Sequence, residues 1–340
     1  MKSTGSDEKD ADRIATFLER FTKVGMRDRC CILLRGRSEE DWDFDRGMTA
    51  GMASQRFLEI AKSADMVWNF AGGLKRRLLS LFKRRVLVDG DPGHYQVSAL
   101  SWDMGLHDHD VFLTAGTKLG QQDCLVPTLD VTWHPFLQFV FLPMWKAAPA
   151  PQRGAPFTSI THWYWGDVWY QGRMISTSKR AAYLRYAELP NKTGYPFELA
   201  AYIHPEEPGD RELLESNGWK VADPYVVTGT PELYQYYLST SRGELCCPKP
   251  IYTELNTGWF SDRSAGYLAS GRPVLMEDTG ISSVLPCGTG LLTFGNIDEA
   301  ASCVEEINAN YAKHSVAARE FAEAHLSSTV CLNRMISACY

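Results

Sequence analysis

Hydrophobic residues follow a helical spacing in some parts of this chain and form short continuous runs in others. Ile14, Phe17, Leu18 and Phe21 share one helical face, and Gly25 marks the end of that helix. Short apolar runs without alternation, separated by helices, are typical of a parallel sheet covered on both faces, so an α/β fold is predicted. Further helices are predicted over 52–64, 179–186, 210–217, 231–239, 261–270, 297–312 and 316–336. Strands are predicted over 31–34, 66–70, 86–89, 110–113, 158–163, 197–202, 220–222, 245–248, 273–276 and 290–294.

Six prolines interrupt this pattern between residues 127 and 156. Proline lacks an amide donor and resists helix formation, so an interdomain linker is predicted over 146–156. We expect an N-terminal Rossmann-like domain over 1–145 and a C-terminal domain over 157–325. A C-terminal helix over 326–340 could cross back to the first domain. The sequence thus predicts two α/β halves with a cleft between them.

Composition narrows the classes of protein that this chain can belong to. With 340 residues, 44% of them hydrophobic and 22% charged, it fits a two-domain globular enzyme. The net charge of −6 argues against nucleic acid as the main partner, because phosphate binding leaves a basic footprint. No apolar run reaches the roughly 18 residues of a membrane span, so no membrane contact is expected.

The first residues and the cysteines indicate a compartment. The start is polar and acidic, unlike a signal or transit peptide. The nine cysteines have neither disulfide nor zinc spacing, so reduced thiols in a cytoplasmic protein are expected. His107 and His109, beside Asp108 and Asp110, lack a third ligand at usable spacing, so no metal site is predicted.

The most informative stretch runs from Asn256 to Gly280. It combines a polar turn, a short helix closed by Gly271, a buried strand and a second glycine loop. Such a layout turns helix N-terminal amides and loop backbone toward a place where an anion could bind. Ser261 is the predicted N-cap of the helix, with its hydroxyl bonded to one of the first amides.

This stretch resembles the C-terminal domain of a bacterial group of GT-B-fold glycosyltransferases. The resemblance rests on Gly258–Val274, on Asp278-Thr279-Gly280 and on the run 285–294. Segments 64–72, 88–93, 109–116, 123–127, 196–200 and 218–221 extend it over about residues 64–336. It implies a GT-B fold of two Rossmann-like domains, the C-terminal one holding a nucleotide-activated sugar and the N-terminal one shaping the acceptor pocket.

The resemblance suggests which residues bind the donor. Arg263 and Ser264, in the first helical turn, would grip the donor phosphates, and a cation there opposes the helix dipole unless an anion is near. The alternative is a surface Arg263 paired with Asp262 or Glu254. Lys249 would neutralise the diphosphate, or is a solvated lysine.

The loop after the next strand adds a second donor contact. Asp278, Thr279 and Gly280 follow a buried strand, where related folds place groups on the sugar hydroxyls. The alternative is an Asx-type turn in which Gly280 supplies a positive φ.

Acceptor activation is predicted in the N-terminal half. Asp91 and His94 follow a strand, and a carboxylate beside a histidine can deprotonate an acceptor hydroxyl or amine. His109 is a further candidate base. A β-turn built on Asp-Pro-Gly needs no function and is the alternative for this loop. Trp163, Trp165 and Trp169 could stack on a ring or pack in the core.

The chain also departs from this resemblance in two places. Many glycosyltransferases of this fold carry two carboxylates eight residues apart around the phosphate-binding helix, and here those positions are Gly258 and Gly266. About one β-α-β unit of roughly 30 residues is also expected to be missing from the start, because a polar tail and a helix precede the matching region.

The leading hypothesis is a glycosyltransferase that moves a sugar from a nucleotide-diphosphate donor to a small-molecule acceptor in specialised metabolism. The nucleotide sugar is a co-substrate, and no further cofactor is expected. The alternatives are a catalytically silent GT-B homologue, serving as a nucleotide-binding or auxiliary subunit, and a GT-B scaffold with different cleft chemistry. A homodimer or a partner subunit is compatible with each.

Overall fold

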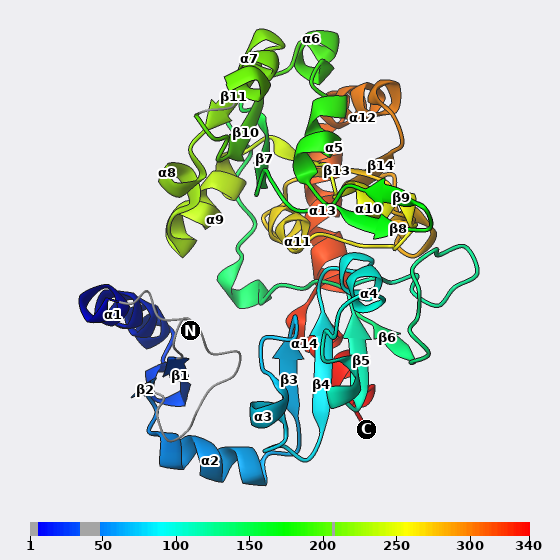
Figure 1. Ribbon diagram of the computed structural model, residues 1–340. Coiled ribbons are helices and arrows are strands. Elements are labelled where there is room, and N and C mark those ends of the chain that lie inside the picture. Colours follow the sequence, from blue (N-terminus) through cyan, green and yellow to red (C-terminus); the bar gives the residue numbers. More distant parts are fainter. Residues whose placement is uncertain (1–5, 35–47, 206–207) are drawn as a thin grey trace. The chain divides into compact units, whose positions relative to one another are not determined.

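The computed structural model of the chain describes residues 6–34, 48–205 and 208–340 (Figure 1). Helices separate most of the strands. The helices are α1 (Asp7–Lys23), α2 (Ser54–Ser63), α3 (Arg76–Leu79), α4 (His94–Ala99), α5 (Lys179–Arg185), α6 (Leu189–Thr193), α7 (Pro208–Ser216), α8 (Pro224–Thr228), α9 (Pro231–Thr240), α10 (Pro250–Glu254), α11 (Asp262–Ala269), α12 (Ile297–Ala309), α13 (Tyr311–His325) and α14 (Ser328–Ser337). The strands are β1 (Cys31–Leu34), β2 (Met48–Gly51), β3 (Val67–Phe70), β4 (Arg85–Asp89), β5 (Val111–Thr114), β6 (Trp133–Pro135), β7 (Phe157–Thr161), β8 (Val168–Tyr170), β9 (Arg173–Ile175), β10 (Phe197–Ala201), β11 (Trp219–Ala222), β12 (Gly243–Cys246), β13 (Val274–Glu277) and β14 (Leu291–Phe294).

The chain divides into two compact units. One comprises residues 1–89 and 103–112, and the other comprises residues 90–102 and 113–340. Within the second unit, residues 146–156 form neither helix nor strand. The start of α14 is tied to Val140, whose carbonyl accepts the amide of Ser328 at 2.9 Å. The domain boundaries given above from the sequence stay a prediction.

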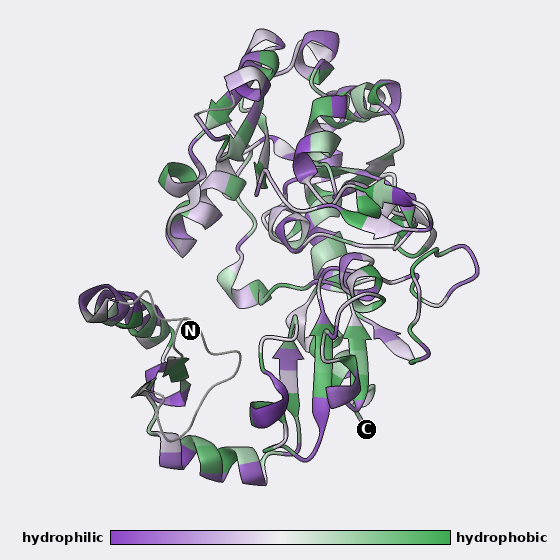
Figure 2. Cartoon of the chain, in the orientation of Figure 1, coloured by the Kyte–Doolittle hydropathy of each residue, from purple (hydrophilic) through white to green (hydrophobic). Residues whose placement is uncertain are grey.

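The first unit contains α1 to α3 and β1 to β4. β3 and β4 pair in parallel, with Val67 opposite Arg85, as the hydrophobic pattern indicates. Figure 2 shows β4 as largely hydrophobic, in keeping with its Val-Leu-Val core. The expectation of a parallel strand over 31–34 is wrong, because β1 pairs antiparallel with β2, placing Cys31 opposite Gly51. β2 has one β-branched residue and ends on glycine, so its sequence gives no strand signal.

The second unit is built on a six-stranded sheet in the order β11-β10-β7-β12-β13-β14. All five pairings are parallel. The strands β10, β12 and β13 are buried at every position, which explains their continuous hydrophobic runs. Counted in chain order from β7, the strand order is 3-2-1-4-5-6, the order of doubly wound α/β folds.

Helices cover both faces of this sheet. Buried residues of α5, α6, α7 and α12 join the strands in one hydrophobic core, which includes Tyr183, Leu214 and Val304. The helices α9, α11 and α13 pack on one another and, through α11 and α13, on the sheet. This layering leaves the carboxyl ends of the strands to loops, and a parallel sheet offers its ligand site there.

A short antiparallel hairpin, β8–β9, lies between β7 and α5 in the sequence and was not predicted. Of the three tryptophans singled out near it, Trp163 is buried and donates to the Asp210 carboxylate at 2.9 Å. Trp165 and Trp169 are exposed, by 52% and 65%. Trp163 is therefore a core residue, whereas the other two are available at the surface of this unit.

Candidate functional site

The sequence and the sheet topology both indicate a ligand site at the carboxyl edge of the six-stranded sheet. The chain order reverses between β7 and β12, and this switch point opens a crevice in doubly wound folds. The segment after β7 leads to Lys179, the first residue of α5. The segment after β12 leads to Lys249, the N-cap of α10. Two lysines and the start of α11 therefore belong to neighbouring loops.

A buried polar cluster lies at the start of α11. The guanidinium of Arg263 has its Nε 3.8 Å from a Glu244 oxygen and its Nη1 3.8 Å from an Asp262 oxygen, both beyond hydrogen-bond range. Its Nε and Nη2 are buried without a hydrogen-bond partner among the described residues. So are the hydroxyls of Ser261 and Ser264 and one oxygen of Glu244. Buried donors in natural proteins are nearly always bonded, so this many unbonded ones call for a ligand or water.

Ser261 departs from one expectation. It does precede α11 as the N-cap, but its hydroxyl makes no bond to the helix amides. A cap requires the side-chain oxygen to accept from the second or third amide of the helix, and the buried Ser261 hydroxyl has no hydrogen-bond partner among the described residues. The prediction that Ser261 satisfies an amide is therefore wrong, and the first amides of α11 keep their capacity to bind an anion.

Lys179 adds a second buried cation. Its side chain is 8% exposed, and its ammonium lies 5.4 Å from the centre of the Trp259 ring. Within the part of the chain that the structure describes, this ammonium has no hydrogen bond and no ion pair. Burial, reinforced by the charge of Arg263, lowers the pKa of Lys179 to about 7. Burial also raises the pKa of Glu244.

A second cluster surrounds Asp91. Its two oxygens accept hydrogen bonds from the ammonium of Lys249 and from the Tyr252 hydroxyl. The Nδ1 of His94 lies 4.0 Å from the same carboxylate. Tyr252 stacks on Trp259 with ring centres 4.6 Å apart, and Trp259 is the ring that Lys179 faces. The aromatic pair thus connects the two clusters.

A groove of about 600 Å³ opens beside these clusters. Trp165 belongs to its wall, and the indole is also approached by Lys249, whose ammonium lies 5.1 Å from the ring centre. Asp167, Ser176 and Arg180 contribute polar groups to the wall. A mixed indole and polar lining suits a polyhydroxylated or aromatic ring. A second cavity, of about 550 Å³, lies at the opposite, amino edge of the sheet.

The chain as a whole is similar to several solved structures. It is similar to the α-glucosyltransferase AGT in complex with UDP, with a TM-score of 0.55 and 13% identity over 84% of this chain and 83% of that one. Anabaena HepE in complex with UDP and glucose has a TM-score of 0.52 and 10% identity over 83% of this chain and 80% of that one. The chain has the GT-B fold. AviGT4, a glycosyltransferase involved in avilamycin A biosynthesis, has a TM-score of 0.50 and 12% identity over 100% of this chain and 94% of that one.

These likenesses confirm the predicted α/β GT-B fold, and identities of 10–13% carry the comparison no further than the fold. No protein-family model and no curated protein matches the sequence.

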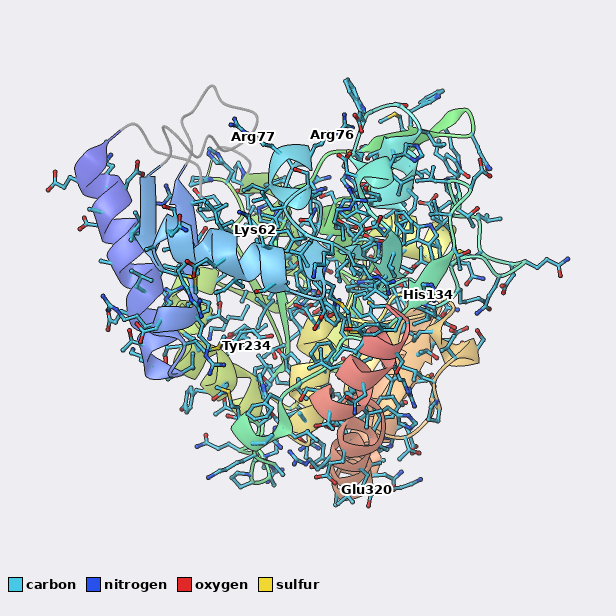
Figure 3. All side chains as sticks on the ribbon, turned by 90° about the horizontal axis from the view of Figure 1, so that it is seen from below. Lys62, Arg76, Arg77, His134, Tyr234 and Glu320 are labelled. Atoms are coloured by element: carbon cyan, nitrogen blue, oxygen red, sulfur yellow. The ribbon has the colours of Figure 1, made fainter. Side chains whose placement is uncertain are left out.

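The two glycines at the carboxylate positions of this GT-B chain are enclosed. A Cβ at Gly266 would lie 2.9 Å from the Trp145 ring and 3.0 Å from Leu238. Trp145 in turn meets Tyr234 of α9, labelled in Figure 3, with ring centres 6.1 Å apart. A Cβ at Gly258 would lie 2.3 Å from the Thr117 hydroxyl, and Gly258 has a φ of +67°. Neither position can accept a carboxylate without repacking.

The loop after β13 is held by its own bonds. Asp278 accepts the Gly280 amide at 2.9 Å and the hydroxyl of Ser282. The Thr279 hydroxyl donates to the Trp259 carbonyl at 2.7 Å, and Gly280 has a φ of +89°. This geometry matches the Asx-type turn that was the alternative interpretation. Contact of these residues with a sugar stays a prediction.

His109 lies in the first unit and is satisfied there. Its Nδ1 donates to the Gly105 carbonyl at 2.8 Å, and its Nε2 accepts from the Asn69 amide at 2.9 Å. Burial lowers the pKa of His109, so the ring is neutral with the proton on Nδ1. Both nitrogens are occupied, which suits a structural histidine better than a base.

Sequence reasoning missed several members of the site. Lys179, Glu244, Tyr252 and Trp259 were not singled out. A lysine at the first position of a helix that begins at the switch point is a usable signal for Lys179, because a cation opposes the helix dipole there. Across the residues described, no three His, Cys, Asp or Glu side chains gather as a metal site, and no helix is long and apolar enough to cross a membrane.

Proposed function

We propose that this protein is a glycosyltransferase that uses a nucleotide-diphosphate sugar as donor. The single observation that carries the proposal is the buried cluster at the start of α11. There, among the residues that the structure describes, two N–H groups of Arg263 are buried without a hydrogen-bond partner, and the ammonium of Lys179 forms no ion pair. The carboxylate oxygens of Glu244 and Asp262 lie 3.8 Å from the guanidinium, beyond hydrogen-bond range. A diphosphate supplies acceptor oxygens that can reach these donors at hydrogen-bond distance, and charge-assisted bonds of this kind are strong. Two of the similar structures, those of AGT and HepE, contain UDP, which agrees with this ligand class.

In this proposal the cluster stabilises the leaving group. Lys179, Arg263 and the first amides of α11 would hold the phosphate oxygens, with the Ser261 and Ser264 hydroxyls as further donors. Negative charge grows on the diphosphate as its bond to the sugar breaks. Preorganised cations and amides in a buried site stabilise that charge strongly. Asp278, Thr279 and Gly280 remain the proposed neighbours of the sugar.

The acceptor is proposed to be a small molecule with a free hydroxyl or amine. Asp91 and His94 stand together beside the groove that contains Trp165, so a base is available where an acceptor could bind. AviGT4, one of the similar structures, is involved in avilamycin A biosynthesis, and a role in specialised metabolism is proposed on that ground alone.

Calorimetric titration with UDP and other nucleoside diphosphates tests the proposal. Lys179→Met removes one buried cation while keeping the volume of the side chain, and should weaken binding about 10- to 100-fold, the value of a charged hydrogen bond. Lys313→Met changes an exposed lysine of α13 and is the matched control. If no nucleoside diphosphate binds the unaltered protein, the proposal fails. Binding without sugar transfer to any acceptor would support the silent GT-B homologue instead.

A further inference from the structure

Asp91 is held from both sides by residues of the α10 segment. Lys249 precedes α10 as its N-cap and forms an ion pair with one carboxylate oxygen, while Tyr252 donates to the other at 2.5 Å. Lys249 is 14% exposed and Asp91 32% exposed, so solvent screens this pair only in part. Lys249 was expected to reach a diphosphate. In the structure its ammonium pairs with Asp91, and contact with a diphosphate stays a prediction.

The turn that contains Asp91 is packed against the same helix. A Cβ at Gly93 would lie 3.3 Å from Ile251 and 3.4 Å from Leu255. The Gly93 amide donates to the side chain of Gln96 at 2.7 Å, which closes the first turn of α4. These contacts fix the carboxylate and the start of α4 in one arrangement with α10.

His94 is the first residue of α4 and faces this fixed carboxylate. Its Nδ1 lies 4.0 Å from Asp91, and its ring meets the edge of Trp165 at 6.5 Å between centres. Its side chain is 27% exposed, and its ring nitrogens form no hydrogen bond with any residue that the structure describes. The charged groups acting on His94 are Asp91 and Lys249. Burial lowers the pKa of His94, and Asp91 opposes this effect.

We propose that Lys249 and Tyr252 are positioning residues that hold Asp91 as a carboxylate beside His94, so that His94 alone takes the acceptor proton. The inference rests on the proposed glycosyl transfer and assigns the acceptor side of that reaction. Both oxygens of Asp91 already accept a hydrogen bond, one from the ammonium of Lys249 and one from the phenol of Tyr252, so the acceptor hydroxyl meets its base at His94. A neutral histidine with an available ring nitrogen is a good proton acceptor at neutral pH.

The reaction step follows from this assignment. The acceptor oxygen attacks the anomeric carbon of the donor, and the bond from that carbon to the diphosphate oxygen breaks with its electron pair going to the diphosphate. The proton of the acceptor hydroxyl moves to Nε2 of His94, while Asp91 stabilises the imidazolium from the Nδ1 side. The proton then passes to solvent, which restores the neutral ring.

Two measurements on the intact protein test the proposal. NMR titration of the histidine ring signals, with His94→Gln to assign the resonance, gives the pKa of His94. Asp91→Asn should lower that pKa by at least about 0.7 unit, the interaction of unit charges 4 Å apart in water. Lys249→Met should raise it, because a positive charge is removed, and Lys249→Arg should restore it.

Calorimetry with UDP separates this inference from the proposed donor site. Lys249→Met and Tyr252→Phe should each leave the UDP dissociation constant within about twofold, whereas donor-site loss costs tenfold or more. A tenfold weaker UDP affinity in Lys249→Met would overturn the positioning role. So would a pKa of His94 that stays the same in Asp91→Asn and in Lys249→Met. Failure of the unaltered protein to bind UDP sinks the proposed function instead, and leaves the titration result to decide whether Lys249 and Asp91 act on His94.

Discussion

The low pKa of Lys179 makes donor binding depend on pH in a direction that can be calculated. At a pKa of about 7, the free protein has its ammonium half protonated at pH 7 and about 1% protonated at pH 9. A diphosphate binds the protonated form, and its own terminal phosphate, with a pKa near 6, is ionised throughout this range. Binding at pH 9 must therefore first protonate the lysine.

The size of the effect follows from linkage. The protonated fraction falls from one half at pH 7 to about 9% at pH 8 and about 1% at pH 9. The UDP dissociation constant should therefore rise about fivefold from pH 7 to 8, about tenfold from pH 8 to 9, and about 50-fold in all. Isothermal titration calorimetry at pH 7, 8 and 9 measures this dissociation constant. Lys179→Met has no ammonium to protonate and should show a nearly flat profile, offset to weaker binding. Parallel profiles for the two proteins would refute the reasoning.

The stability of the free protein should increase with pH over the range in which UDP binding becomes weaker. The pKa of Lys179 is lower in the folded protein than in the unfolded chain, so the unfolded state binds more protons between about pH 7 and 10.4. The free energy of unfolding therefore rises with pH in this window, by up to about 1.4 kcal/mol per unit, and the penalty is fully present below pH 7. Urea denaturation of the unaltered protein minus that of Lys179→Met isolates this contribution, because other titrating groups cancel.

Three further predictions concern stability. Gly266→Ala should lower the unfolding free energy by about 1–3 kcal/mol through overlap with Trp145, and an unchanged urea midpoint would show that α11 can shift away. His109→Ala should lower the free energy of unfolding by about 1–3 kcal/mol, because the Asn69 amide loses its acceptor. UDP affinity measured by calorimetry should not change. Weaker UDP binding with unaltered stability would instead place His109 in the ligand site. Asp278→Ala should lower the melting temperature, because the Gly280 amide loses its acceptor at a cost of about 0.5–2 kcal/mol; an unaltered melting temperature would contradict the Asx-turn assignment.

Elements with a buried hydrophobic run or a clear helical period could be predicted from the sequence, and exposed short strands could not. The strand predicted over 273–276 is β13, Val274–Glu277, and the helix predicted over 231–239 is α9, Pro231–Thr240. The β8–β9 hairpin was missed because strands of three residues, with Trp169 and Met174 exposed, show no periodic burial. The helix predicted over 297–312 ends at Ala309, and α13 begins at Tyr311.

The candidate site was predictable in position but not in its partnerships. Arg263 and Ser261 were found because a polar turn before a short helix marks an anion site. Lys249 was placed at the edge of the cleft, yet its partner Asp91 lies 158 residues away in the sequence. Lys179 was overlooked although a cation at the first position of a helix opposes the dipole, because its burial and its place beside Trp259 depend on the tertiary structure.

By itself, the sequence determined the α/β class, the six strands of the large sheet and the segment that forms the start of α11. These depend on local periodicity and on caps and glycines, which act over a few residues. Tertiary structure alone decided that the Nε and Nη2 atoms of Arg263 are buried without a hydrogen bond and that Lys179 has no ion pair among the described residues. It also decided that Lys249 pairs with Asp91 and that β1 runs antiparallel. Burial, desolvation and strand pairing arise between segments far apart in the chain, so no local pattern of side chains encodes them.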